Sequence, residues 1–227
     1  FSSQTAKLME EEDQEIVFTN SLKYRKDIGL YEIDELIGIG QFGEVRRCTD
    51  TATHTGDYAI KFIEKVQSGE LCDYYYTLLT REVSIQSQVK HPALLPLISF
   101  GEDAFNRTFI VSPYMSQKSL DDHIFKGKSK MASLNPTQKF IVIYGTASGM
   151  KCLHRRRVIH RDLKPANILL NENFYPFVCD FGFAKYVPTN ENSNFSVRPG
   201  TPLYQAPELL PKNDDDADDD EADNANL

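Results

Sequence analysis

The sequence lacks features that would each point to a particular class of protein. Its four cysteines include no C-x-x-C pair, so neither a disulfide framework nor a zinc site is indicated. A reducing compartment, the cytoplasm, is therefore expected. No apolar run approaches the ~20 residues needed to span a bilayer. The chain begins with Phe1 rather than Met, so its start does not exclude a targeting segment upstream.

The chain also lacks a charge excess outside one short segment. The formal net charge is −8, but residues 212–227 carry seven Asp, one Glu and one Lys, which leaves about −1 for the rest of the chain. This balance predicts neither a nucleic-acid nor a membrane surface. The run from Asp214 to Asp223 cannot bury apolar surface and is predicted to be disordered. It is either a solvating tail or a binder of basic proteins.

Composition and periodicity divide the chain into four parts. The first is a polar lead-in without a sustained period, the second is rich in strand patterns, the third is more helical, and the fourth is the acidic tail. Their expected bounds are 1–29, 30–115, 116–211 and 212–227.

The second part predicts an antiparallel sheet with one helix, because short turns separate its apolar strand patterns. The expected strands are 31–37, 45–48, 58–63, 94–100 and 108–114. The helix is expected from Tyr75 to Lys90, since the residue before Pro92 disfavours helical backbone. In the third part, Asn135-Pro136 predicts the start of a helix that continues to Leu153.

A glycine cluster follows the first predicted strand. Gly38, Gly40 and Gly43 fit the pattern G-x-G-x-x-G-x-V, which ends at Val45. Glycines let backbone amides approach phosphate oxygens without a Cβ clash. The same spacing occurs in Rossmann dinucleotide sites, but these need a helix directly after the glycines. Here a second strand is predicted, which disfavours that alternative.

The most informative stretch is His160–Asn167, with the sequence HRDLKPAN, followed by Asp180-Phe181-Gly182. It places a carboxylate, an ammonium and an amide on one loop and a second carboxylate shortly downstream. Such a set can hold a hydroxyl, a phosphate and magnesium at the same time.

Together these motifs resemble eukaryotic protein kinases over about residues 30–210. The resemblance implies an α+β, two-lobed fold, with an antiparallel N-lobe carrying one helix and a mostly helical, incomplete C-lobe. It implies ATP- and Mg²⁺-dependent transfer of the γ-phosphate to serine and threonine hydroxyls of protein substrates. Lys164 after the catalytic aspartate and the run Gly200–Glu208 are similar to serine/threonine kinases, including the tyrosine-kinase-like group.

The resemblance assigns four catalytic roles. Asp162 orients the substrate hydroxyl and accepts its proton, and Lys164 lies at the γ-phosphate. Lys61 bridges the α- and β-phosphates, and Glu82 pairs with Lys61. Taken alone, Lys61 also fits a solvated strand lysine, and Glu82 also fits a surface glutamate.

The resemblance also assigns Asn167 and Asp180 as magnesium ligands. In the adenine pocket, Ser112 is a small gatekeeper. Pro113 lacks an N–H but offers its carbonyl, and Met115 supplies the donor. The residues implied to bind ATP are Ile37, Gly38, Gly40, Gly43, Val45, Ala59, Lys61, Ser112, Pro113, Met115 and Leu169.

Four residues are expected to regulate or modify the site. Arg161 is placed to pair with a phosphorylated activation segment, in which we expect Ser196 to be the switch; the alternative is an unmodified polar loop. Thr201 is expected to brace Asp162. Cys179 is hypothesised to be accessible from the nucleotide site; its alternative is a buried, inert thiol.

The resemblance breaks in two places. Members of the family continue past Ala206-Pro207-Glu208 with further helices, so Glu208 is expected to lack its partner and the helix at 136–153 to lack cover. A stabilising or activating protein partner is therefore expected, and a nucleotide-binding regulatory module without catalysis is the alternative function. Gln86 replaces an apolar residue expected to contact Phe181 and Leu97, which predicts an easily displaced helix and a Lys61–Glu82 pair that is not constitutive.

Overall fold

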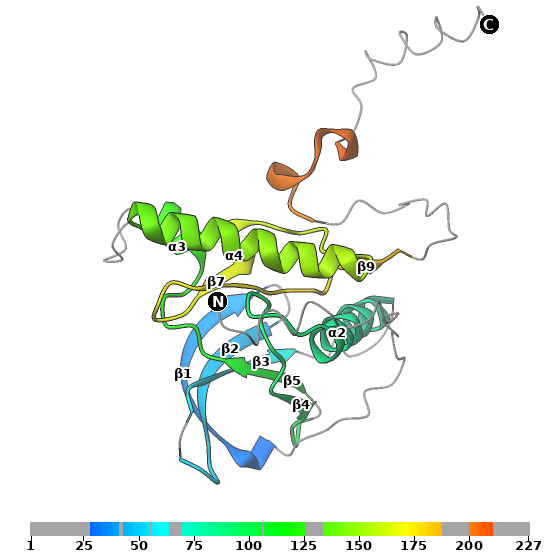
Figure 1. Cartoon of the computed structure of the whole chain (residues 1–227). Helices are drawn as coiled ribbons and strands as arrows, with labels where there is room; N and C mark the ends of the chain where they lie inside the picture. The colour runs from blue at the N-terminus through cyan, green and yellow to red at the C-terminus, as the bar shows by residue number, and fades with distance from the viewer. Residues whose placement is uncertain are drawn as a thin grey trace, which may run out of the picture.

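The described part of the chain forms two lobes, one built on a β-sheet and one on a long helix (Figure 1). The structure is a computed structural model that describes residues 28–40, 43–54, 56–63, 70–105, 107–125, 134–187 and 200–210. In the helix that begins at Glu70, side chains are described from Thr77 onward. The two-lobed α+β architecture expected from the sequence is confirmed.

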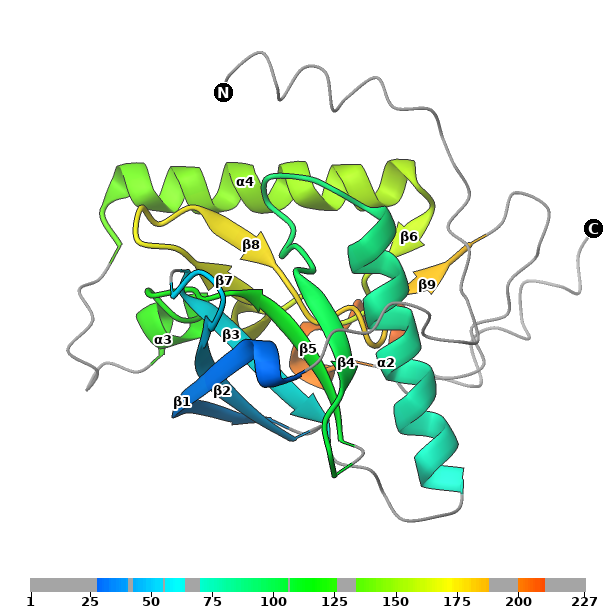
Figure 2. The same cartoon turned by 90° about the horizontal axis from the view of Figure 1, so that it is seen from below.

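The first lobe contains a five-stranded antiparallel sheet with strand order β1-β2-β3-β5-β4 (Figure 2). The strands are β1 (Tyr31–Gly40), β2 (Gly43–Asp50), β3 (Tyr58–Ile63), β4 (Ser99–Glu102) and β5 (Thr108–Pro113). The 3-10 helix η1 (Ile28–Leu30) precedes β1, and Ile28 packs against the cluster that contains Tyr31 and Phe62. The packed lobe therefore includes two residues expected to belong to the lead-in.

Helix α2 (Glu70–Gln88) covers one face of this sheet (Figure 2). Leu79 and Val83 of α2 join Ile63, Phe100 and Ile110 in one buried cluster. The helix starts five residues before the expected Tyr75, because neither glycine nor proline interrupts residues 70–74.

The strand expected at 94–100 is only partly correct. Ser99 and Phe100 belong to β4, but Leu94 forms a parallel bridge with Val178 of the second lobe. The Leu95 N–H donates to the Val178 carbonyl at 2.9 Å, and the Val178 N–H donates to the Ala93 carbonyl at 2.9 Å. This segment therefore links the lobes, which no local pattern could reveal.

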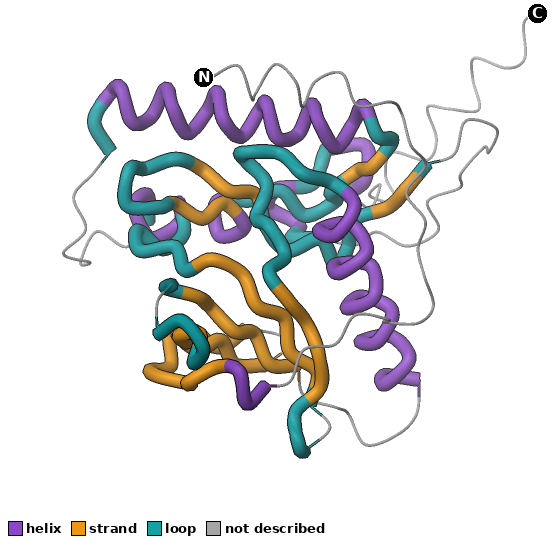
Figure 3. Tube along the Cα trace, turned by 60° about the horizontal axis from the view of Figure 1, so that its bottom comes forward, coloured by secondary structure: helices purple, strands orange, loops and turns teal. Residues whose placement is uncertain are grey.

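The second lobe is organised around helix α4 (Pro136–Arg155), which runs along its length (Figure 3). Asn135 caps α4 by accepting from the Gln138 N–H at 2.9 Å, and Pro136 occupies the first turn, as predicted. The other elements are α3 (Leu120–Ile124), β6 (Val158–Ile159), η2 (Pro165–Asn167), β7 (Ile168–Leu170), β8 (Pro176–Val178), β9 (Lys185–Tyr186), η3 (Pro202–Tyr204) and η4 (Pro207–Leu209).

One buried cluster crosses between the lobes. Ile85 of α2 packs with Leu153 of α4, Val178 of β8 and Phe181. The outer side of α4 remains open to solvent, with Phe140 and Ile143 exposed by 68% and 70%. Among the described residues, no helix is both long and apolar enough to cross a membrane.

Candidate active site

The glycine cluster forms the tip of the hairpin between β1 and β2. Gly40 pairs with Gly43, and Gly38 pairs with Val45. Gly43 has φ of +136°, a conformation that a side chain disfavours. Because a strand rather than a helix follows the glycines, the Rossmann alternative is excluded.

Lys61 and Glu82 form a buried ion pair between β3 and α2. Lys61 Nζ lies 2.8 Å from Glu82 Oε2, and Glu82 is only 7% exposed. Burial alone would lower the pKa of Lys61, but Glu82 and Asp180 outweigh it and raise that pKa. The ammonium therefore stays charged, with Asp180 close enough to act on it.

Two small residues face each other where the adenine pocket is expected. Ala59 of β3 and Ser112 of β5 are direct partners in the sheet, so their side chains share a face, and Lys61 follows two residues after Ala59 on that same face. Val45 pairs with Lys61 across β2 and β3. The sheet thus brings these expected ATP-binding residues together.

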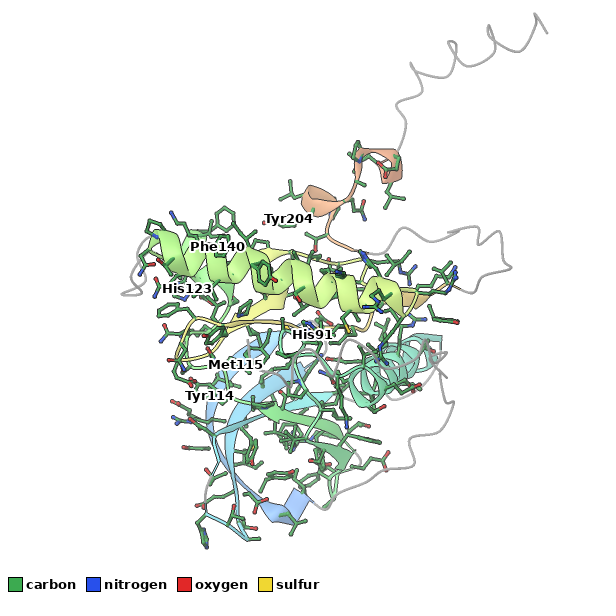
Figure 4. The ribbon with its side chains drawn as sticks, in the orientation of Figure 1. His91, Tyr114, Met115, His123, Phe140 and Tyr204 are labelled. Carbon is green, nitrogen blue, oxygen red and sulfur yellow. The ribbon has the colours of Figure 1, made fainter. Side chains whose placement is uncertain are left out.

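The segment joining the lobes is tied to β2 and to the residue before β3 by contacts that the sequence did not reveal. The Tyr114 N–H donates to the Asp57 carbonyl at 2.8 Å, and the Arg47 guanidinium lies 4.9 Å from the Tyr114 ring centre. Arg47 also donates twice to the Asp57 carboxylate. Figure 4 shows Tyr114 and Met115 at this junction. Pro113 ends β5, Ile37 lies in β1, and Leu169 lies in β7 of the second lobe.

Asp162 is held from several directions. Its Oδ1 accepts from the Thr201 N–H at 2.9 Å and the Thr201 hydroxyl at 2.8 Å, while Oδ2 accepts from Asn167 at 3.0 Å and lies 2.8 Å from Lys164 Nζ. Lys164 Nζ also donates to the Thr201 hydroxyl at 2.8 Å. Burial favours the neutral acid, but the Lys164 and Thr201 contacts outweigh it and lower the pKa of Asp162. The carboxylate is therefore ionised and fixed in orientation.

Gly200 explains how Thr201 reaches that position. It has φ of +110°, and a Cβ at this residue would collide with the Arg161 carbonyl. The glycine lets the chain pass close to the catalytic loop, so the next residue can contact Asp162.

Asp180 has the features expected of a magnesium ligand. Its Oδ1 is buried without a hydrogen-bond partner among the described residues. A buried carboxylate oxygen left unpaired is costly unless a cation binds it. Asn167 is anchored through its Nδ2, which donates to the Asp162 carbonyl at 2.9 Å. Among the described residues no group of three or more His, Cys, Asp or Glu side chains could hold a metal ion by itself, so phosphate and water oxygens would complete the coordination shell.

His160 and Phe181 lock the two loops together. Their ring centres are 5.4 Å apart in an edge-to-face arrangement, and His160 Nε2 lies 3.0 Å from the Cys179 carbonyl. Both side chains are almost fully buried. This packing holds the loop of Asp162 against the turn of Asp180.

Comparison with known proteins agrees with this geometry. Residues 31–223 match the model of the Protein kinase domain family. The chain belongs to the protein kinase domain family. It is 32% identical over 180 residues to "Serine/threonine-protein kinase fused" of Drosophila melanogaster, covering 79% of this chain and 21% of that protein. It is 33% identical over 179 residues to "Probable serine/threonine-protein kinase PBL20" of Arabidopsis thaliana, covering 77% and 45%.

A third relative shows that similarity extends to proteins without activity. The kinase domain is 30% identical over 184 residues to "Inactive serine/threonine-protein kinase PLK5" of Mus musculus, covering 81% of this chain and 29% of that protein. The chain thus spans less than half the length of each of these three relatives.

Two arginines of the kinase domain converge at the start of the activation segment. Arg161 Nε donates to the Phe183 carbonyl at 2.7 Å, and Arg81 Nη1 of α2 donates to the Gly182 carbonyl at 3.0 Å. Burial, and then the charge of Arg81, lower the pKa of Arg161, so the two guanidinium groups are close enough to repel. Ser196 lies outside the described residues.

Gln86 is only partly accommodated in the kinase domain. Its Nε2 donates to the Leu95 carbonyl at 3.3 Å, but its buried Oε1 has no partner in the described part of the chain. Ile85, the preceding residue, shares the buried cluster of Phe181, while Leu97 packs against a different cluster. The Lys61–Glu82 pair is formed one turn before Gln86.

Cys179 is partly exposed as a residue, but its thiol group is buried. Burial, followed by the nearby charges of Asp180 and Glu82, raises the pKa of the thiol far above its usual range. The thiolate is the reactive form of cysteine, so this position favours the inert alternative.

A separate hollow of about 600 Å³ lies on the sheet face opposite Lys61. Phe62 contributes to it, and the Arg107 guanidinium lies 4.5 Å from the centre of the Phe62 ring. Arg107 is paired with Asp103 at 2.8 Å, and Arg46 with Glu44 at 3.1 Å. The charged side chains that line the hollow are thus paired with one another, and they indicate no charged ligand.

Proposed function

We propose that this chain transfers the γ-phosphate of ATP to serine or threonine hydroxyls of protein substrates. The observation that carries the proposal is the arrangement of two charged groups, one from each lobe, with Asp180 close enough to Lys61 for its charge to act on it. From the sheet lobe comes the Lys61–Glu82 pair, and from the helical lobe comes Asp162 with Lys164 and Asn167. Positioning and electrostatics supply most of the acceleration in this reaction class.

In the proposed reaction Asp162 orients the hydroxyl of the substrate and receives its proton. All four acceptor positions of its carboxylate are engaged, two by Thr201, one by Asn167 and one by Lys164. Of these donors, Lys164 has the most flexible side chain, and its ammonium also donates to the Thr201 hydroxyl. We expect Lys164 to turn toward the γ-phosphate when ATP binds, which vacates one acceptor position on Asp162 for the substrate hydroxyl.

Lys61 holds the α- and β-phosphates, and Glu82 keeps its ammonium in place. Asn167 and Asp180 are the residues that would hold magnesium, which offsets the charge of the phosphates when it is bound. The unpaired Oδ1 of Asp180 supports this assignment. Ala59, Ser112 and Met115 line the proposed adenine pocket.

We also propose that phosphorylation of the activation segment, at Ser196, increases activity. Arg161 and Arg81 place two cations side by side and at present use backbone carbonyls as acceptors. A phosphate would give Arg161 a charged acceptor and relieve its repulsion with Arg81. The expected effect is loss of activation in Ser196→Ala.

The proposed setting is the cytoplasm. Three of the four cysteines, Cys48, Cys152 and Cys179, form no disulfide bond. Burial raises the pKa of Cys48 to about 11, which also slows its oxidation.

Two measurements on the same preparation test the function. The first is the rise in Tm caused by ATP with Mg²⁺, and the second is transfer of labelled phosphate to a generic basic protein. We expect both in the unmodified chain, while Asp162→Asn should keep the Tm rise and lose transfer, and Asp180→Ala should weaken both. A Tm rise without any transfer, in a preparation phosphorylated by an activating kinase, would favour the regulatory nucleotide-binding module instead.

A further inference from the structure

The C-terminal end of α4 carries a cluster of basic side chains that the catalytic machinery does not use. Lys151, His154 and Arg155 are spaced i, i+3 and i+4, so they lie on one face of the helix, and Arg157 follows directly. All four residues are exposed. We call these four residues the α4 basic cluster.

None of the four side chains in the α4 basic cluster forms a hydrogen bond or an ion pair with a described residue. The neighbouring Arg156 differs, because its Nη1 donates to the Gln88 carbonyl at the end of α2, 3.3 Å away. The dipole of α4 favours cations at this end, but like charges on adjacent turns repel. Binding of an acidic ligand to the α4 basic cluster is therefore favourable, because it reduces this repulsion.

We propose that the α4 basic cluster binds the acidic run Asp214–Asp223 of the same chain. That run places eight carboxylates in ten residues, while the chain outside residues 212–227 has a net charge of about −1. The run is the larger of two acidic segments in the chain, the other being Glu10–Glu15 with five carboxylates in six residues. Its charge is opposite in sign to that of the α4 basic cluster, and it is the segment that closely follows residues 200–210.

Connectivity favours binding within one chain over binding between chains. The acidic run begins four residues after Leu210, the last described residue, and an extended chain spans about 3.3 Å per residue. Figure 1 shows residues 200–210 on the side of α4 that faces away from the sheet. A short tether of this kind gives an effective concentration in the millimolar range, so even weak ionic contacts are occupied.

The α4 basic cluster lies next to the strands that lead into the catalytic loop and the activation segment. Arg157 leads directly into β6, where Val158 pairs with Tyr186 of β9. The Val187 N–H donates to the Arg157 carbonyl at 2.9 Å. A tail bound here lies beside the strand that enters the catalytic loop and beside the residues that precede the activation segment.

Carbodiimide cross-linking tests the proposal on the full chain, because this reagent joins a lysine amine to a carboxylate only when the two are in contact. Lys151 belongs to the α4 basic cluster, whereas Lys139 is an equally exposed lysine twelve residues earlier on the same helix and outside it. Peptide mapping of the monomeric fraction should show Lys151 joined to residues 214–223 at least fivefold more often than Lys139. This preference should disappear at 1 M salt, where the screening length falls to about 3 Å.

The double variant Arg155→Gln and Arg157→Gln provides the matched control, because glutamine removes the charge without adding a carboxylate that could couple to Lys151, and both positions are exposed. It should lower the Lys151 yield severalfold while leaving the Tm rise caused by ATP unchanged. Equal yields at Lys151 and Lys139, or a Lys151 yield that salt and the double variant leave unchanged, would overturn the proposal. Products found only in covalent dimers would show an acidic partner bound between chains, which also contradicts it.

Discussion

Gln86 and Leu95 are joined by a hydrogen bond from a buried side-chain amide to a backbone carbonyl, 3.3 Å in length. Because the Leu95 N–H is itself bound to Val178, this contact connects α2 with the lobe that carries Asp180. The same glutamine leaves its buried Oε1 without a partner in the described part of the chain. It therefore both links the lobes and destabilises the helix that bears Glu82.

Replacing Gln86 with leucine should raise the free energy of unfolding by about 1 kcal/mol, because an unsatisfied buried oxygen is removed. For a chain of this size that corresponds to a Tm higher by roughly 2–4 °C. Basal phosphate transfer should also increase, since α2 then holds Glu82 more firmly. Differential scanning calorimetry and initial rates measure the two effects. Gln86→Glu is the control and should lower Tm; a Tm for Gln86→Leu at or below that of the unmodified chain contradicts the prediction.

Removing the hydroxyl of Thr201 should slow catalysis without preventing nucleotide binding. Thr201→Ala keeps the backbone N–H bond to Asp162 but removes the hydroxyl bonds to Asp162 and Lys164. We expect kcat to fall on the order of tenfold, which equals ~1.4 kcal/mol of transition-state stabilisation. Thr201→Ser should recover most of the rate. If serine and alanine give the same kcat, the hydroxyl has no part in orienting Asp162.

Cys179 should react slowly with electrophiles at neutral pH. Burial and two neighbouring carboxylates raise the pKa of its thiol, so little thiolate is available. Mass spectrometry after iodoacetamide treatment should show labelling at Cys179 that increases with pH and decreases with excess ATP. The Cys179→Ser variant identifies the site. Rapid labelling at pH 7 that ATP does not slow would exclude both the inert thiol and the position at the nucleotide site.

The chain should lose stability as the pH falls below about 6.5, the usual pKa of histidine. Burial lowers the pKa of His91 in the folded state. As the pH decreases, the unfolded chain therefore binds the proton first, and the free energy of unfolding decreases. His91 Nδ1 accepts from the Ala93 N–H at 3.1 Å, a contact that protonation removes. Thermal unfolding between pH 7.5 and 5.5 should show a shallower decline for His91→Asn, which retains an acceptor. If the dependence of Tm on pH is the same in His91→Asn, other groups, such as His160, cause the decline.

Contacts between residues near in sequence were predictable because short-range rules govern them. Asn135-Pro136 specifies the start of α4 through capping and a fixed φ angle, and the Gly40–Gly43 hairpin follows from turn chemistry. The motif around Asp162 was recognised instead by its resemblance to protein kinases. By contrast, residues 94–95 have a strand-like composition yet pair with Val178 in the other lobe, so their partner could not be found from periodicity.

By itself the sequence determined the chemical groups and the local elements that carry them: the glycine hairpin, the loop of Asp162 and the turn of Asp180. Only the tertiary structure decided which groups meet. Thr201 reaches Asp162 across 39 positions in the chain because Gly200 permits a close backbone approach. Lys61 meets Glu82 because α2 packs on the sheet, and Gln86 obtains one hydrogen bond and not two. Such pairings depend on packing between distant segments, which a linear pattern does not encode.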